Sequence, residues 1–317
     1  MGKKVRYLLS DFDFNKEEVL GILNSAQEIK KNPEKFFDAL KNKTLVMLFE
    51  KTSTRTRISF EAAMTQLGGH AIYWESRTSQ IAKGEPLSDI GKVVSRYCQA
   101  IMARMYRQQD LEEIAKVATV PVINGLTDVF HPCQCLGDLL TVKEKLGDLK
   151  GTVAFFGDCG FNIGHSTMIT FSKIRMNVNL VCPKKKKYQP NPEILKRAKK
   201  EAEGKIKIIH EPLEGIKNAD VVMTDTWVSM GQEKESKPRI KDLRPYQVNS
   251  ELMKKANKGA IFMHCLPAYR GYEMTKEVID GPQSVVFDQA ENRLHIQKAI
   301  LLKLMKYGKR GINFFDK

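Results

Sequence analysis

The sequence predicts an α/β protein with two doubly wound parallel-sheet domains. Short apolar runs typical of buried strands alternate with amphipathic helical stretches along the chain. The 317 residues exceed the usual size of one hydrophobic core, and about 150 residues per domain suggests two. A predicted helix and linker at 131–151 joins the two sets of strands.

Each set consists of short apolar runs. The first half has four predicted strands, "TLVMLF" (44–49), "AIYW" (71–74), "AIMARMY" (100–106) and "VPVING" (120–125). Helical periodicity appears between them, as in "RISFEAAMTQL" and "DIGKVVSRYC". The second half has six predicted strands, at 151–158, 178–183, 205–211, 220–226, 260–267 and 284–289.

The charge balance suits an anionic partner. Lys and Arg total 52 against 37 Asp and Glu, a formal net charge of +15, which fits nucleic acid, an anionic surface or a small anionic substrate. Much of the excess lies in lysine-rich runs such as "PKKKKYQP" (183–190), which we interpret as solvated faces. A nucleic-acid stripe would interleave arginine with aromatic residues, so we expect no nucleic-acid partner.

Cysteine usage and hydropathy indicate a cytoplasmic protein. Six cysteines in a chain of this length form no disulfide framework, and the N-terminus has no apolar stretch long enough for a signal peptide. No run approaches the ~20 apolar residues of a membrane span, so we expect no membrane partner.

The stretch "FEKTSTRTRISFEAA" (49–63) predicts an anion site. A strand ends there, a hydroxyl-rich turn follows, and a helix begins with unpaired N–H groups and the positive end of its dipole. Ser53, Thr54 and Thr56 can donate hydroxyl hydrogen bonds, and Arg55 and Arg57 offer bidentate guanidinium groups. An ordinary capped helix is the simpler alternative, but it leaves the alternation of hydroxyl and arginine unexplained.

Other polar residues also follow predicted strands, where open parallel sheets bind ligands. These residues are Arg104, His131, Gln134, Asp225 and Cys265. The polar stretch "GQEKESKPRIKDLRPYQ" after "DTWVSM" is interpreted as either a lid or binding loop or a disordered tether.

Cofactor motifs are missing from the sequence. The glycines of "AFFGDCGFNIGHS" do not form G-x-G-x-x-G, and no Walker pattern occurs, which disfavours NAD and ATP. "HPCQC" and "HC" contain zinc-ligating residue types but no C-x-x-C or H-x-x-x-H spacing. We expect neither a metal nor a cofactor.

Four motifs in order, "STRTR", "HPCQ", "DTWVSMG" and "HCLP", closely resemble the aspartate/ornithine carbamoyltransferase family over almost the whole chain. The resemblance implies a carbamoyl-phosphate-binding domain at 1–145, on which a C-terminal helix at 290–317 packs back. It also implies an ornithine-binding domain at 146–289. A homo-oligomer follows from it as well, a trimer or a multiple of trimers.

The resemblance also implies roles for individual residues. Those that would act in catalysis are Arg104, His131 and Cys265. Those that would bind carbamoyl phosphate are Ser53, Thr54, Arg55, Thr56, Gln80, Arg104, His131, Gln134, Cys265, Leu266 and Arg293, with Arg57 left open and Gln80 reaching in from a neighbouring subunit. Those that would bind ornithine are Asn162, Asp225, Ser229 and Met230. Two departures from the family pattern are "FN" at 161–162, where paired asparagines are usual, and Arg270, where many members carry an acid.

The implied reaction transfers the carbamoyl group of carbamoyl phosphate to the δ-amine of L-ornithine, giving L-citrulline and phosphate, in arginine biosynthesis or the arginine deiminase pathway. "SMG" after an aspartate resembles the ornithine branch. One alternative is transfer to another amine such as putrescine or N-acetylornithine. A weaker alternative is a non-catalytic basic protein that binds nucleic acid.

Overall fold

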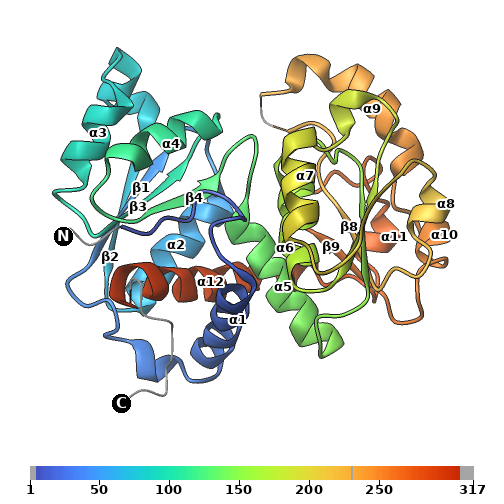
Figure 1. Ribbon diagram of the computed structural model, residues 1–317, viewed down its shortest axis with the longest axis horizontal. Helices are drawn as coiled ribbons and strands as arrows, with labels where there is room; N and C mark the ends of the chain where they lie inside the picture. The colour runs from blue at the N-terminus through green and yellow to red at the C-terminus, as the bar shows by residue number, and fades with distance from the viewer. Residues whose placement is uncertain (1–4, 230, 308–317) are drawn as a thin grey trace. The chain divides into compact units, whose positions relative to one another are not determined.

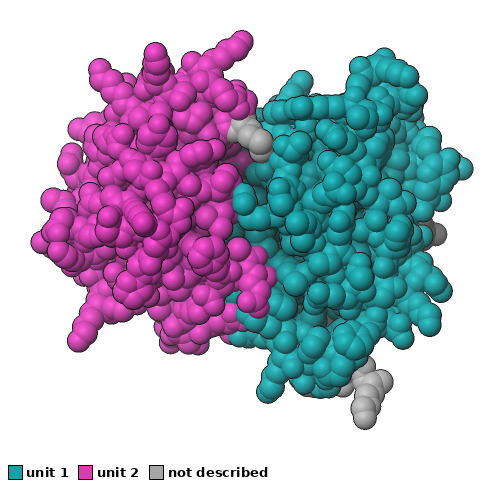
Figure 2. All heavy atoms as spheres, turned by 180° about the vertical axis from the view of Figure 1, so that it is seen from behind, with its two compact units in different colours: residues 1–140, 292–317 teal, residues 141–291 magenta. Residues whose placement is uncertain are grey.

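The computed structural model describes residues 5–229 and 231–307. The chain forms two compact units, coloured separately in Figure 2. Unit 1 comprises residues 1–140 and 292–317, and unit 2 comprises residues 141–291. Each unit contains a sheet whose strand pairs are all parallel, which confirms the predicted fold class.

Unit 1 is built on a four-stranded sheet in the order β2-β1-β3-β4. Its strands are β1 (Thr44–Phe49), β2 (His70–Glu75), β3 (Ala100–Arg104) and β4 (Val122–Leu126). Its helices are α1 (Lys16–Lys31), α2 (Thr54–Gln66), α3 (Leu87–Val94), α4 (Gln108–Val117), the first part of α5 (Pro132–Leu146) and the later part of α12 (Val286–Leu302). Helices α3 and α4 cover one face of the sheet, and α1, α2 and α12 cover the other (Figure 1).

Burial on both faces explains the unbroken apolar run of β1. Val46 and Leu48 pack with Leu111 and Ile114 of α4. The alternate residues of the strand, which point to the opposite face, are buried as well. A central strand covered on both sides is apolar throughout, and for this reason the sequence locates it well.

Unit 2 is built on a five-stranded sheet in the order β7-β6-β5-β8-β9. Its strands are β5 (Thr152–Phe156), β6 (Asn177–Val181), β7 (Ile206–Ile209), β8 (Val221–Thr224) and β9 (Ile261–His264). Its further helices are α6 (Asn162–Lys173), α7 (Pro192–Glu201), α8 (Pro212–Gly215), α9 (Ser236–Leu243), α10 (Ser250–Met253) and α11 (Lys276–Ile279). Helices α6 and α7 lie on one side of the sheet, and α8, α10 and α11 lie on the other (Figure 1).

Short helical turns complete the described elements. The 3-10 turns are η1 (Pro33–Phe36), η2 (Ser76–Thr78), η3 (Gln80–Lys83), η4 (Lys186–Tyr188), η5 (Glu233–Glu235) and η6 (Arg244–Tyr246), and a π-helical turn, η7 (Lys303–Tyr307), follows α12. The polar stretch at 231–247 therefore contains η5, α9 and η6, so it is an ordered connection and the tether interpretation is wrong. Within the described ranges, no helix is both long and apolar enough to cross a membrane.

The strand predicted at 284–289 is wrong. Only Ser284 bridges to Phe262, and helix α12 begins at Val286. A three-residue apolar run is compatible with a strand or with the buried side of a helix start, and periodicity over so few residues cannot separate them. Asp288 lies in the first turn of α12, where a carboxylate stabilises the helix dipole.

Helix α12 and the turn η7 pack on the rest of unit 1, as predicted for the C-terminal helix, and residues 308–317 of the predicted helix lie outside the described residues. Lys30 Nζ of α1 donates to Asn292 Oδ1 at 2.9 Å. Lys303 Nζ lies 3.2 Å from Glu18 Oε1, and its ammonium group lies over the ring of Phe14. These contacts fix α12 against the first helix of the chain.

Candidate active site

The hydroxyl-rich turn forms the start of α2. Ser53 is the N-cap, and its hydroxyl accepts a hydrogen bond from the Thr56 backbone N–H at 3.3 Å. The first turn of α2 contains no acidic residue, so no carboxylate there neutralises the positive end of the helix. Arg55 is half-buried and Thr54 is exposed, whereas Thr56 is fully buried.

The two arginines of this turn have different surroundings. Arg57 is exposed, its Nε lies 3.0 Å from Glu61 Oε1, and its guanidinium group stacks over the Tyr73 ring at 3.8 Å. Its charge is therefore already paired on the outer surface of α2. Arg55 is the better candidate for an anion at the helix start.

Strand register places Arg104 beside this turn. Phe49, the last residue of β1, pairs with Arg104, the last residue of β3, and the Glu50 N–H donates to the Arg104 carbonyl at 2.9 Å. Arg104 is only 7% exposed. A buried guanidinium group at the carboxyl edge of a parallel sheet is suited to bind an anionic ligand.

A second buried arginine comes from the other end of the chain. Arg293 of α12 donates from Nη2 to the Thr56 hydroxyl at 2.8 Å. A Cβ atom added to Gly137 would lie 3.5 Å from Arg293 Cγ, so α5 and α12 pack closely at this point. The resemblance predicted Arg293 for the same site as Thr56, and the structure brings the two side chains into contact.

His131 and Gln134 enter the cluster from the start of α5. His131 is 4% exposed, and its carbonyl accepts from the Gln134 N–H at 3.0 Å. Gln134 Nε2 donates to Asp138 Oδ1 at 2.8 Å. Gln134 Oε1 is buried and has no hydrogen-bond partner among the described residues. This oxygen is therefore able to accept a hydrogen bond from an N–H group of a ligand.

Burial lowers the pKa of His131 well below its ordinary value of 6.5, and the charges of Arg293 and Arg104 act in the same direction. The imidazole is therefore neutral at physiological pH. A neutral imidazole donates from one ring nitrogen and accepts at the other, so it can hydrogen-bond a carbonyl oxygen without carrying a charge.

This neutral histidine makes stability depend on pH. Because the folded pKa lies below the unfolded value, the unfolded chain binds the proton more readily. The contribution of His131 is thus complete above pH 6.5 and is lost as pH falls toward the folded pKa. Between pH 7.5 and 5.5 we expect the wild type to lose about 1.4 kcal/mol more unfolding free energy than His131→Gln. Urea titrations at both pH values measure this difference, and equal losses in the two proteins would contradict it.

Unit 2 brings Asp225 and Cys265 together. Thr224 of β8 pairs with Phe156 of β5 and with His264 of β9, so the residues after these strands share one edge. Cys265 Sγ donates to Asp225 Oδ1 at 3.1 Å, and the Thr226 N–H donates to the same oxygen at 2.7 Å. Both side chains are half-buried, which leaves part of each exposed to a ligand.

Three other predicted residues also follow strands of unit 2: Asn162 follows β5, Ser229 follows β8 and Leu266 follows β9. Asn162 is buried at the first position of α6, and its Oδ1 accepts from the Ile163 N–H at 2.7 Å. The Ser229 N–H donates to Gln232 Oε1 at 3.2 Å. Leu266 is half-buried in the left-handed backbone region, with φ of 58°. Met230 lies outside the described residues.

A buried pair that the sequence did not single out supports the "HCLP" turn. The Leu266 N–H donates to His264 Nδ1 at 2.9 Å, so the imidazole proton resides on Nε2, which lies 3.2 Å from Glu273 Oε1. Glu273 Oε1 also accepts from the Tyr269 N–H at 2.7 Å. His264 is therefore a scaffold residue of this turn. The "HC" dipeptide drew attention to it, but nothing local identified Glu273.

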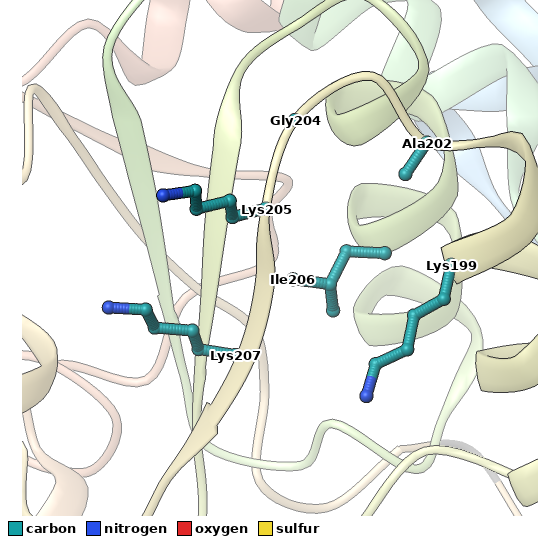
Figure 3. Close-up of a pocket in the computed structure, with 6 residues that line it drawn as sticks. All are labelled: Lys199, Ala202, Gly204, Lys205, Ile206 and Lys207. Atoms are coloured by element: carbon teal, nitrogen blue, oxygen red, sulfur yellow. The ribbon is translucent and has the colours of Figure 1, made fainter.

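Two locations lie apart from these clusters. Gln80 is exposed in η3, as a residue offered to a neighbouring subunit would be. A surface hollow of about 380 Å³ beside β7 is lined by Lys199, Ala202, Gly204, Lys205, Ile206 and Lys207 (Figure 3). Lys205 and Lys207 point to one side of the strand and Ile206 to the other, and no predicted site residue lines the hollow.

Comparison with known families identifies both halves of the chain. The aspartate/ornithine carbamoyltransferase carbamoyl-P binding domain matches residues 6–144. The Asp/Orn binding domain of the same family matches residues 150–304. The chain belongs to the aspartate/ornithine carbamoyltransferase family. The four sequence motifs thus identified the carbamoyltransferase family correctly.

Individual carbamoyltransferases match over nearly their whole length. The ornithine carbamoyltransferase of Pyrococcus furiosus that is named anabolic is 48% identical over 306 residues, covering 95% of this chain and 96% of that protein. The Methanobrevibacter smithii ornithine carbamoyltransferase is 50% identical over 305 residues, covering 94% and 99%. The solved Pyrococcus furiosus ornithine carbamoyltransferase superimposes with a TM-score of 0.89 at 48% identity, covering 95% and 97%.

Proposed function

We infer that the protein transfers the carbamoyl group of carbamoyl phosphate to the δ-amine of L-ornithine, giving L-citrulline and phosphate. The observation that carries this inference is near-50% identity, over nearly the full chain, to proteins named ornithine carbamoyltransferase. The buried arginine and histidine cluster of unit 1 and the Asp225–Cys265 pair of unit 2 fit the two substrates chemically. The anabolic name of the Pyrococcus furiosus relative favours arginine biosynthesis.

Carbamoyl phosphate is assigned to unit 1. Its phosphate lies at the start of α2, where backbone N–H groups, the hydroxyls of Ser53 and Thr54 and the Arg55 guanidinium group surround the oxygens. Its carbonyl oxygen accepts from Arg104, His131 and the Thr56 hydroxyl. The carbamoyl NH₂ donates to Gln134 Oε1, the buried acceptor described above. Arg293 holds Thr56 in place through its 2.8 Å hydrogen bond.

Ornithine is assigned to unit 2. Asp225 binds the α-ammonium group, and Asn162 and Ser229 bind the rest of the amino-acid end. Met230 completes this set by resemblance. The resemblance assigns Cys265 and Leu266 to the reacting groups. The Cys265 hydrogen bond to Asp225 supports an orienting role for the thiol.

The reaction forms a C–N bond and breaks a C–O bond. The lone pair of the δ-amine attacks the carbonyl carbon, whose oxygen gains negative charge in the tetrahedral intermediate. Arg104 and His131 stabilise this charge, because donors already in place need no reorganisation during the reaction. The intermediate then collapses, the C–O electron pair leaves with phosphate, and the amine proton passes to solvent or to the phosphate. Since the free amine has a pKa of about 10.4, activity rises with pH above neutrality.

A homo-oligomer, a trimer or a multiple of trimers, is part of this proposal. Ile58 on α2 and Ile72 on the edge strand β2 are 59% and 43% exposed, which fits a contact surface on unit 1. Sedimentation equilibrium tests the oligomeric state, and a monomer at assay concentration would contradict it. A cytoplasmic location agrees with the cysteines, because none of the six, all within the described ranges, forms a disulfide.

The test of function offers carbamoyl phosphate with ornithine, putrescine or N-acetylornithine in parallel. We expect a carbamoylated product from ornithine alone. Product from another amine would leave the phosphate site intact but overturn the acceptor assignment, and no product from any amine would overturn the proposed activity. Cys265→Ala is assayed beside the wild type, and its turnover with ornithine would exclude a covalent role for the thiol.

A further inference from the structure

We propose that Arg239 is a positioning residue that sets the geometry of the acceptor loop, defined here as residues 225–229. Sequence analysis interpreted the stretch that contains Arg239 as a lid or binding loop or a tether, and gave Arg239 itself no role. The proposal rests on the proposed function, because Asp225 and Ser229 of this loop are the residues assigned to ornithine.

Arg239 is buried and bonds other segments of unit 2, although the stretch of sequence that contains it is polar. It is only 4% exposed. Its Nε donates to the Trp227 carbonyl at 2.6 Å, and its Nη2 donates to the Asp158 carboxylate. Its guanidinium carbon lies 5.3 Å from the centre of the Tyr188 ring. One planar cation therefore bonds two separate segments while an aromatic face limits its movement.

The two bonded segments are those that carry the predicted ornithine ligands. The Trp227 carbonyl lies two residues from both Asp225 and Ser229, so fixing it determines the path of the loop between them. Asp158 lies in the turn between β5 and α6, where it also accepts from the Gly160 N–H at 2.9 Å, and this turn leads directly into Asn162. Arg239 thus fixes the acceptor loop relative to the turn that precedes Asn162.

Helix α9, which carries Arg239, is itself anchored by the lysine-rich run. Lys185 Nζ lies 2.5 Å from Asp242 Oδ1, and the Tyr188 hydroxyl donates to Asp242 Oδ2 at 3.1 Å. The sequence "PKKKKYQP" was interpreted as a solvated face. The four lysines of this run are exposed, in agreement with that interpretation, and Lys185 and Tyr188 in addition join the segment after β6 to α9 one helical turn from Arg239. This second contact fixes the backbone that supports the guanidinium group.

The Trp227 side chain reports on the loop independently of activity. It is 1% exposed and stacks on Tyr272, with ring centres 6.4 Å apart and planes inclined by 19°. The chain contains two tryptophans, so Trp74→Phe leaves Trp227 as the single emitter. If Arg239 positions the loop, its loss will alter the burial of this indole ring.

The experiment compares Arg239→Lys with Arg197→Lys, both made in the wild type and in Trp74→Phe. Lysine retains the charge that balances Asp158 but has one nitrogen, which cannot replace both the Nε and the Nη2 bonds. Arg197 is a control on α7 that pairs with Glu201 at the surface. We expect Arg239→Lys to raise KM for ornithine about tenfold or more, with KM for carbamoyl phosphate within about twofold of the wild type. Its Trp227 emission shifts to the red, and Arg197→Lys changes neither quantity.

Three outcomes would overturn the proposal: an unchanged KM for ornithine in folded Arg239→Lys, an equal rise in both KM values, or a lower kcat with both KM values unchanged. If Arg239→Lys does not fold, the same quantities are measured on the double variant Asp158→Asn with Arg239→Gln, which removes both buried charges. The same three outcomes would then overturn the proposal. Failure of the proposed function looks different, because the wild type itself would then make no citrulline.

Discussion

Arg55→Ala is expected to lower kcat/KM for carbamoyl phosphate by about 100-fold or more, the loss typical of one partner of a desolvated, hydrogen-bonded charge pair. Arg55 is half-buried at the start of α2, beside the Ser53 cap, and no acidic residue of the first turn competes for its charge. The effect falls on carbamoyl phosphate, so saturating ornithine does not restore the rate.

Arg57→Ala is the matched control. Arg57 has the same side chain as Arg55 and lies two residues away, but its guanidinium group is paired with Glu61 and stacked on Tyr73. We expect less than about a fivefold change, because exposed pairs of this kind are worth at most about 1 kcal/mol. Steady-state kinetics with carbamoyl phosphate varied measures both variants. Equal losses would show that the anion is bound by the total charge of α2 and not by Arg55 in particular.

Arg104→Met is expected to lower kcat by about 100- to 1,000-fold, the range for removal of one oxyanion donor. Arg104 is buried where β3 ends, and its charge is one of the influences that keep the His131 pKa low. Arg107→Met is the control, because Arg107 is exposed and pairs with Asp110 at 3.7 Å. The control should retain the wild-type rate.

The same substitution has a pH signature. Removing a positive neighbour raises the pKa of His131, so a larger fraction of the imidazole is protonated at pH 6 in Arg104→Met than in the wild type. The deficit of the variant should therefore be greater at pH 6 than at pH 8. An equal deficit at the two pH values would contradict this expectation and would mean that burial and Arg293 alone keep the imidazole neutral at pH 6.

The sequence predicts the sheet strands well because both faces of each central strand are buried. β1 has the same bounds as the run "TLVMLF", while β3 ends at Arg104, two residues before the predicted strand does. The strand predicted at 284–289 is wrong because the run contains few apolar residues. Tertiary packing then decides whether such a run extends a sheet or begins a helix. Element type follows from burial pattern, and short elements depend on contacts that the local sequence does not contain.

For the candidate site, motifs identify residues but not their surroundings. Arg55 and Arg57 are indistinguishable in "STRTR", and only Tyr73, on β2, separates them. Likewise Arg239 lies in a stretch without apolar periodicity, and its partners Asp158 and Tyr188 precede it by 81 and 51 residues. Contacts between residues so far apart in sequence leave no local pattern to recognise.

The hydrogen bond from Arg293 to Thr56 spans 237 residues, and the whole of unit 2 lies within the intervening chain. During synthesis on the ribosome, every residue of unit 2 has emerged before the later part of α12 becomes available to unit 1. The first unit therefore remains without its last helix during this time, and the apolar surface that this helix covers stays exposed. The second unit can already form its own core. The biosynthetic order thus makes the phosphate-binding half the last to mature, although it is the first to be translated.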